Sequence, residues 1–252
     1  MFNNVKIAFF DIDGTLANDD KIISNKSKTA LLKLKEKGTI LVLSSGRWDT
    51  YMLDFNKDLN IIDYIIANNG ASIIDVKNKK VLYEDILNTD EINLIEKYIL
   101  NKNLNATYNG LYKQFKPGEI IDTSIYQIII ECNTKEEVSN FIKYIDTIPT
   151  LKIGYVSAAY YKDKIVNTYS INVNINKTNK GNSISYLLNK LNIEKKYSIC
   201  FGDNISDLPM FNACGIKVAV DNALPELKEH ADYITLSNND DGVAHFINNN
   251  LI

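Results

Sequence analysis

The stretch KIAFFDIDGTLAND, residues 6–19, decides the fold. Its apolar run at residues 7–10 predicts a buried strand, and Asp11 and Asp13 with the Gly-Thr pair behind them predict a polar loop directly after that strand. In open α/β sheets, ligands bind at the carboxyl ends of the strands. Taken alone, the pattern also fits a strand with an ordinary Asp-Gly turn. Three later apolar runs end in polar clusters of matching chemistry, which favours a functional loop.

Composition limits the classes of function. The chain has 252 residues, 45% of them hydrophobic, enough for two α/β-type domains. The net charge of -3 and the scattered lysines disfavour a nucleic-acid partner. No apolar stretch approaches the ~20 residues that span a bilayer, and no signal-peptide pattern opens the chain, so we expect no membrane partner and a cytoplasmic location. The three cysteines lack metal-ligand spacing and are expected to be buried thiols.

The order of predicted elements divides the chain. Strands and helices alternate in residues 1–85 and again in residues 179–252, which predicts parallel βαβ units. Residues 86–178 mix helices with short strands, among them strands predicted at residues 152–156 and 169–175. We therefore expect a Rossmann-like, three-layer α/β core with a mostly parallel sheet, into which an α+β domain is inserted.

Two further segments bring anion-binding chemistry to the core. TILVLSSGR at residues 39–47 predicts a strand whose loop carries Ser45 and Gly46, a hydroxyl and a flexible backbone position that can cradle an anion with backbone N–H groups. The segment at residues 176–193 opens with a polar turn containing Lys180 and continues as an amphipathic helix. Lys180 therefore adds a positive charge beside the predicted anion.

Four aspartates are expected at one edge of the sheet. Asp11 and Asp13 follow the first strand, and GDNISD at residues 202–207 follows a later one, adding Asp203 with Asp207 as a further candidate. Like charges this close raise each other's pKa unless a cation is present. Mg²⁺ binds few carboxylates and keeps room for a phosphate oxygen, so the cluster predicts a Mg²⁺ site and phosphoryl-transfer chemistry.

The two aspartates in the first loop suggest two different catalytic roles. Asp11 is the candidate nucleophile, which attacks phosphorus in line and forms an aspartyl-phosphate. Asp13 is the candidate acid/base, which protonates the leaving oxygen and later takes a proton from water. Mg²⁺ and Lys180 are expected to neutralise the charge that gathers on the phosphoryl oxygens.

With these residues assembled, the sequence resembles the haloacid dehalogenase-like (HAD) hydrolases, and among them the Cof-type phosphatases of type IIB. The segments that carry the resemblance are, in chain order, DIDGT at 11–15, Ser45 in SSGR, Asn69-Gly70-Ala71, Lys180 in NKG, GDNISD at 202–207 and SNNDDGVAHFI at 237–247. The resemblance implies that the inserted domain is a C2B-type cap, which closes over the active site, excludes water and shapes substrate choice.

The resemblance also implies site residues by position. Asp11, the backbone of Asp13 and Asp203 are implied to hold Mg²⁺. Asp207 is a possible further ligand, or lies behind the ligands. The implied phosphate contacts are the backbone of Ile12, Ser45, Gly46, Lys180 and Ser206. Similar proteins usually carry Asn where this chain has Ser206, so that contact needs a shorter side chain or a water.

Three functions remain open. The leading hypothesis is a Mg²⁺-dependent phosphatase, a monomer or weak homodimer acting on a small phosphate ester such as a sugar phosphate. The second is a hexose-phosphate mutase, because phosphomannomutases resemble the chain in first motif and cap type. A mutase is expected to need several cap arginines, and Arg47 is the only arginine in the chain. The third is a non-catalytic phosphometabolite-binding protein, which only Ser206 favours.

Overall fold

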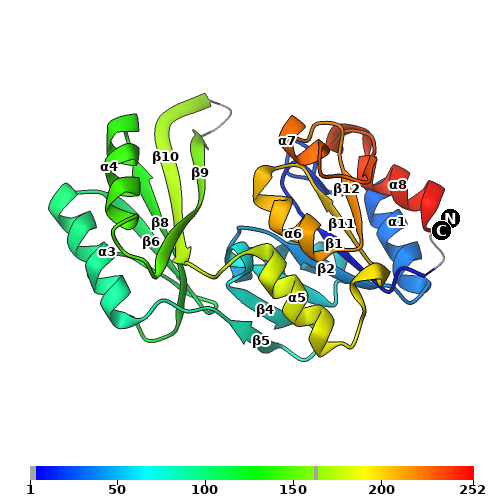
Figure 1. Cartoon of the computed structure of the whole chain (residues 1–252), viewed down its shortest axis with the longest axis horizontal. Coiled ribbons are helices and arrows are strands. Elements are labelled where there is room, and N and C mark those ends of the chain that lie inside the picture. The colour runs from blue at the N-terminus through cyan, green and yellow to red at the C-terminus, as the bar shows by residue number, and fades with distance from the viewer. Residues whose placement is uncertain (1–3, 162–163) are drawn as a thin grey trace. The chain divides into compact units, whose positions relative to one another are not determined.

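The computed structural model of the chain describes residues 4–161 and 164–252, without the side chains of residues 58, 155, 157–161 and 164–167 (Figure 1). The chain divides into two compact units, Met1–Tyr83 with Asn179–Ile252 and Glu84–Thr178. We call them the core unit and the inserted unit. The role of the inserted unit as a cap stays a prediction.

The core unit is built on one large sheet in the order β13-β12-β11-β1-β2-β3-β4-β5. Neighbouring strands from β13 to β3 run parallel, and β4 pairs antiparallel with β3. This confirms the predicted α/β class with a mostly parallel sheet. The strands are β1 (Ile7–Phe10), β2 (Ile40–Ser44), β3 (Tyr64–Ala67), β4 (Ser72–Asp75), β5 (Lys80–Glu84), β11 (Ser198–Gly202), β12 (Ile216–Ala219) and β13 (Tyr233–Ile234).

Helices cover both faces of this sheet. The pair α1 and α8 packs together, as does the pair α5 and α6, and Figure 1 shows the two pairs on opposite sides of the strands. The helices are α1 (Asn25–Glu36), α2 (Asp49–Leu59), α5 (Lys180–Lys190), α6 (Leu208–Ala213), α7 (Pro225–Lys228) and α8 (Gly242–Asn250). Short 3₁₀ turns are η1 (Asn68–Gly70), η2 (Lys195–Tyr197), η3 (Ile205–Asp207) and η4 (Asn238–Asp240).

Strand β1 lies at the centre of the sheet, between β11 and β2. Phe10, its last residue, is in register with Phe201 on one side and Leu43 on the other. All four residues of β1 are buried, as expected for a parallel strand covered on both faces. The next residue, Asp11, therefore leaves the sheet at its carboxyl edge between two other strand ends.

The start of α5 is fixed by its cap and by its contact with α6. The Asn179 side chain accepts a hydrogen bond from the backbone N–H of Asn182 at 2.9 Å, which makes Lys180 the first helical residue. A Cβ atom on Gly181 would lie 2.2 Å from the carbonyl oxygen of Pro209, so no larger residue fits between the two helices. This contact seats Lys180 against the loop that precedes α6.

The inserted unit has its own sheet and its own apolar core. The sheet order is β7-β6-β8-β10-β9 with antiparallel pairing, and Figure 1 shows both helices on one face. Its elements are α3 (Thr89–Lys102), β6 (Asn105–Gly110), β7 (Gln114–Phe115), β8 (Ile125–Cys132), α4 (Lys135–Ile145), β9 (Leu151–Tyr161) and β10 (Lys164–Ile175). Strands β9 and β10 are longer than predicted, because they pair with each other as far as Tyr161 and Lys164.

The backbone at Gly215 lies close to the backbone at Lys195, and this contact allows a test of the packing in the core unit. A Cβ atom on Gly215 would lie 2.4 Å from the carbonyl oxygen of Lys195. Gly215→Ala should therefore lower the free energy of unfolding by about 1–3 kcal/mol, as overpacking does. Urea denaturation measures the change, with Asn212→Ala, on an exposed side chain, as the control. Equal stability of the two variants would contradict the packing.

Candidate active site

Two strand ends bring distant aspartates together. Asp11 follows β1 and Asp203 follows β11, its neighbour, and the Asp11 N–H donates to the Phe201 carbonyl at 3.1 Å. One carboxylate oxygen from each of Asp11, Asp203 and Asp207 lies within 4.8 Å of the others. We call these three residues the acidic cluster. The sheet therefore brings together two residues, Asp11 and Asp203, that are far apart in the sequence and separated by the whole inserted unit.

Lys180 lies inside the acidic cluster. Its Nζ donates to Asp11 Oδ1 at 2.5 Å and to Asp207 Oδ1 at 2.6 Å, and all three side chains are buried. Burial alone would lower the pKa of Lys180, but the two carboxylates raise it above its usual value. The lysine is therefore charged and offsets one of the three negative charges.

The remaining negative charge changes the acidity of the cluster. Burial, opposed by Lys180, raises the pKa of Asp11 well above its usual range. Burial and the neighbouring Asp207 raise the pKa of Asp203 to about 6. Three carboxylates face one ammonium group, so two negative charges lack a counter-charge within the cluster. An all-oxygen donor set with this charge fits a hard divalent cation.

The turn after Asp13 supports Asp203. The Thr15 hydroxyl donates to Asp203 Oδ1 at 2.8 Å. Gly14 has a φ of 80°, and a Cβ atom there would lie 2.6 Å from Asp203 Oδ2, so only glycine fits. Thr15 received no role in the sequence analysis. Its position in the DIDGT segment was the one signal that could have indicated this support.

Asp207 is a support inside the cluster. Its Oδ2 accepts hydrogen bonds from the backbone N–H groups of Asp203 and Asn204, both at 3.1 Å, while Oδ1 binds Lys180. One side chain therefore fixes both the loop that carries Asp203 and the cation beside Asp11. Both carboxylate oxygens of Asp207 are therefore engaged, and whether it also binds a metal stays a prediction.

Asp13 has different partners. Arg47 donates to its carboxylate from Nε at 2.5 Å and from a terminal nitrogen at 2.6 Å, and Lys21 Nζ lies 3.2 Å away. The Arg47 guanidinium in turn lies 4.1 Å from the centre of the Tyr51 ring. Burial acts to raise the pKa of Asp13, but the hydrogen bonds and charge of Arg47 outweigh it and lower that pKa. The sequence analysis did not predict this pair.

The remaining candidates lie around the same strand ends. Ser45 is buried directly after β2, where its hydroxyl oxygen accepts from the Arg47 N–H at 3.3 Å. A Cβ atom on Gly46 would lie 2.6 Å from Asn69 Oδ1, so a larger residue there would have to displace the Asn69 side chain. Ile12 is buried beside Asp11, and Ser206 is half-buried in η3. Whether these groups contact phosphate stays a prediction.

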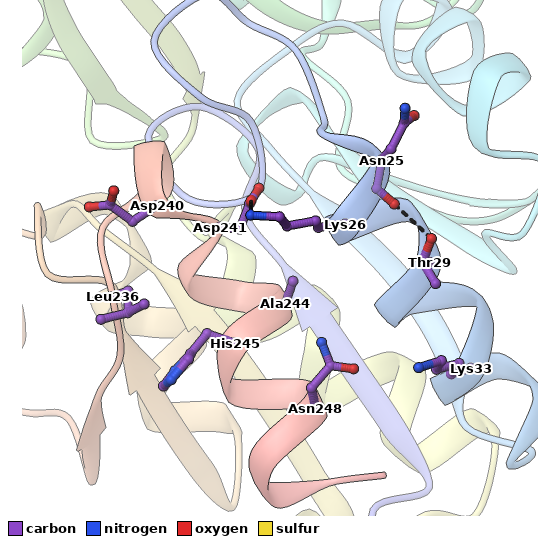
Figure 2. Close-up of a pocket in the computed structure, with 10 residues that line it drawn as sticks. All are labelled: Asn25, Lys26, Thr29, Lys33, Leu236, Asp240, Asp241, Ala244, His245 and Asn248. Carbon is purple, nitrogen blue, oxygen red and sulfur yellow. Dashed lines mark hydrogen bonds and ion pairs between the residues drawn. The ribbon is translucent and has the colours of Figure 1, made fainter.

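A separate hollow of about 540 Å³ lies between α1 and α8 (Figure 2). Lys26, Asp241 and His245 are among its lining residues, and none of the lining residues belongs to the acidic cluster. The hollow is therefore not part of the candidate site. None of the helices in the described part of the chain has the length and apolar composition that crossing a membrane requires.

Comparison with known proteins agrees with this geometry. The family model of the haloacid dehalogenase-like hydrolases matches residues 8–115 and 109–247. A 5-amino-6-(5-phospho-D-ribitylamino)uracil phosphatase of Bacillus subtilis (strain 168) is 27% identical over 247 residues, which cover 97% of this chain and 95% of that protein.

Solved structures share the fold. A haloacid dehalogenase-like hydrolase from Bacteroides thetaiotaomicron matches with a TM-score of 0.84 and 23% identity, covering 96% of this chain and 98% of that chain. A HAD subclass IIB sugar phosphatase matches with a TM-score of 0.77 and 22% identity, covering 96% and 98%. The two-unit architecture is therefore one that known structures of this class adopt.

The excess negative charge of the acidic cluster predicts stabilisation by a divalent cation. Adding Mg²⁺ to the metal-free protein should raise the melting temperature, since a ligand at 100 times its Kd stabilises a protein by about 2.7 kcal/mol. Asp203→Asn should abolish the rise, and Asp232→Asn, on the exposed edge of the sheet, should retain it. A thermal shift titration measures both. An equal rise in Asp203→Asn would place the cation elsewhere.

Proposed function

Because this chain belongs to the haloacid dehalogenase-like hydrolase family and is a phosphoric monoester hydrolase of that kind, we propose that it hydrolyses a small phosphorylated metabolite through an aspartyl-phosphate on Asp11. The observation that carries the proposal is the buried contact of Lys180 with Asp11 beside Asp203. A nucleophile, a metal site and an anion-binding cation thus share one strand edge.

Asp11 is placed for attack by its neighbours. Lys180 holds Oδ1 at 2.5 Å, which leaves Oδ2 to approach phosphorus. A lysine ammonium has three N–H donors, and among the described residues two of them bind Asp11 and Asp207. The third can donate to an oxygen of the transferring phosphoryl group. Lys180 therefore orients the nucleophile and binds the group that it attacks.

The carboxylates of Asp11 and Asp203 fit Mg²⁺, and the backbone carbonyl of Asp13 would be its third ligand from the protein. Bound there, Mg²⁺ supplies positive charge to the oxygens of the transferring phosphoryl group. The chain's own residues prepare that position. Thr15 binds the side chain of Asp203, and Asp207 binds the backbone N–H of Asp203.

Asp13 carries out the proton transfers in this proposal. It protonates the leaving oxygen of the ester, and it then takes a proton from the water that hydrolyses the aspartyl-phosphate. Arg47 grips its carboxylate with two parallel hydrogen bonds, which fix the orientation of both oxygens. We propose that the remaining phosphate contacts come from the backbone of Ile12, Ser45, Gly46 and Ser206.

The proposed substrate is a phosphate monoester of a sugar or a related polyol. The Bacillus subtilis relative is named for a phosphoribityl compound, which supports this class. The mutase alternative needs cations for a second phosphate. Arg47, the only arginine, lies in the core unit and binds Asp13, which favours the phosphatase.

A panel of phosphate esters, assayed with and without Mg²⁺, tests the proposal. We expect the wild-type chain to release phosphate from sugar or polyol phosphates only with Mg²⁺. Asp11→Asn should lower kcat at least ~1000-fold, because it removes the nucleophile. Asp232→Asn should leave kcat unchanged. Hydrolysis that persists in Asp11→Asn would exclude the aspartyl-phosphate, and interconversion of hexose phosphates without phosphate release would establish the mutase instead.

A further inference from the structure

The closing segment SNNDDGVAHFI, residues 237–247, has no part in the proposed chemistry, yet it is tightly built. Asp241 has a φ of 58°, and a Cβ atom on Gly242 would lie 1.8 Å from the carbonyl oxygen of Leu236. The Thr235 hydroxyl donates to the Gly242 carbonyl at 2.7 Å. The start of α8 is therefore fixed against the strand before it.

From this fixed segment, Asn238 reaches the loop that follows β1. Asn238 is 4% exposed, and its Nδ2 donates to the Ala17 carbonyl and to Asp19 Oδ1, both at 3.1 Å. A backbone carbonyl can only accept, which fixes the orientation of this amide. The same loop is bound by Asn239, whose Nδ2 donates to Asp19 Oδ2 at 3.0 Å.

Asn222 continues the connection to the catalytic residues. Its Oδ1 accepts from the backbone N–H of Asn238 at 2.9 Å, and its Nδ2 donates to the Gly14 carbonyl at 2.7 Å. Gly14 separates Asp13 from Thr15, the residue that binds Asp203. Hydrogen bonds of two asparagine side chains therefore connect the closing segment to Gly14, the residue between Asp13 and Thr15.

A third contact holds the far end of the loop. The Ser24 hydroxyl, which caps α1, donates to Asp241 Oδ1, and Lys26 pairs with the same carboxylate at 3.5 Å (Figure 2). The loop between β1 and α1 is thus bound at Ala17, Asp19 and Ser24 by the closing segment and at Gly14 by Asn222. These contacts add to the backbone hydrogen bonds within the loop.

We propose that Asn222 and Asn238 are positioning residues for the reaction: they hold the Gly14–Asp19 part of the loop so that Asp13 and Thr15 meet the ester and Asp203. The proposal rests on the proposed function. Neither side chain is placed against the reacting atoms. Because a misplacement of ~1 Å can lower a rate ~100-fold, weak anchoring should lower kcat more than it changes KM.

Asn222→Asp is the sharpest test. The new side chain has the same shape and still accepts from the Asn238 N–H, but it presents an oxygen to the Gly14 carbonyl. Asn222 is exposed, so the variant should fold. We expect kcat to fall about 10-fold or more with KM within ~3-fold, since an interaction that orients the transition state is lost. Amide hydrogen exchange of the peptide covering residues 12–17 should quicken at least ~5-fold.

The matched control is Asn249→Asp, which removes an exposed amide-to-carbonyl hydrogen bond to His245 on α8. It should leave kcat and the exchange rate unchanged. If Asn222→Asp matches this control in either measurement, the proposal is overturned. If the wild-type chain hydrolyses no ester, the proposed function fails, whereas faster exchange in Asn222→Asp still supports the anchoring and unchanged exchange overturns it.

A reciprocal exchange tests Asn238. Asn238→Asp places its carboxylate against that of Asp19 and against the Ala17 carbonyl, and Asp19→Asn added to it restores only the amide-to-carboxylate hydrogen bond between positions 19 and 238. The single change should lower kcat, and the double change should recover it at least ~3-fold, as coupled neighbours do. If Asn238 served only the stability of the fold, kcat of the folded protein would not recover in the double variant. A double variant with no higher kcat than the single variant would therefore contradict the proposal.

Discussion

The core unit depends on one buried ammonium group among three carboxylates. Lys180 binds Asp11 and Asp207, yet three negative charges face one positive charge. Burying an unpaired ion costs on the order of several kcal/mol, so the lysine offsets only part of the electrostatic penalty of the cluster. Burial, together with the charge of Asp207, raises the pKa of Asp203 to about 6. A site that is electrostatically incomplete by itself is suited to receive a cation and a phosphate together, because each ion lowers the cost of binding the other.

Two aspartates of one loop show how neighbours, rather than residue type, set chemical character. Burial raises the pKa of Asp11, whereas Arg47 lowers that of Asp13, although the two residues are separated by one position. The difference arises because Asp11 points into the acidic cluster and Asp13 is gripped by Arg47 at the next strand end. Each shift opposes the proposed role, because a nucleophile has to be ionised and a general acid has to carry a proton. A cation at the acidic cluster would lower the pKa of Asp11, and loss of the Arg47 contact would raise that of Asp13.

The sequence predicted what local pattern controls. The apolar runs predicted the strands that precede Asp11 and Asp203, and a helix was predicted after the polar turn that contains Lys180, where the structure begins α5 at Lys180 itself. The bidentate contact of Arg47 with Asp13 could not be predicted, because it joins two loops and depends on strand order. The same holds for Thr15, whose partner lies 188 residues away. In the inserted unit, β9 and β10 extend beyond the predicted segments because they pair with each other, and the extent of that pairing is not a local property of either segment.

Absent side chains also shape the site. A Cβ atom on Gly202 would lie 2.8 Å from the Cβ of Asp207, and Gly14 and Gly46 leave equally little room beside Asp203 and Asn69. An added methyl group at Gly14 or Gly46 would meet the side chain of Asp203 or Asn69, so each glycine leaves that side chain the room it occupies. At Gly202 it would meet Asp207, whose carboxylate binds Lys180. The spacing of glycines in the motifs is therefore as much a part of the site's geometry as the aspartates between them.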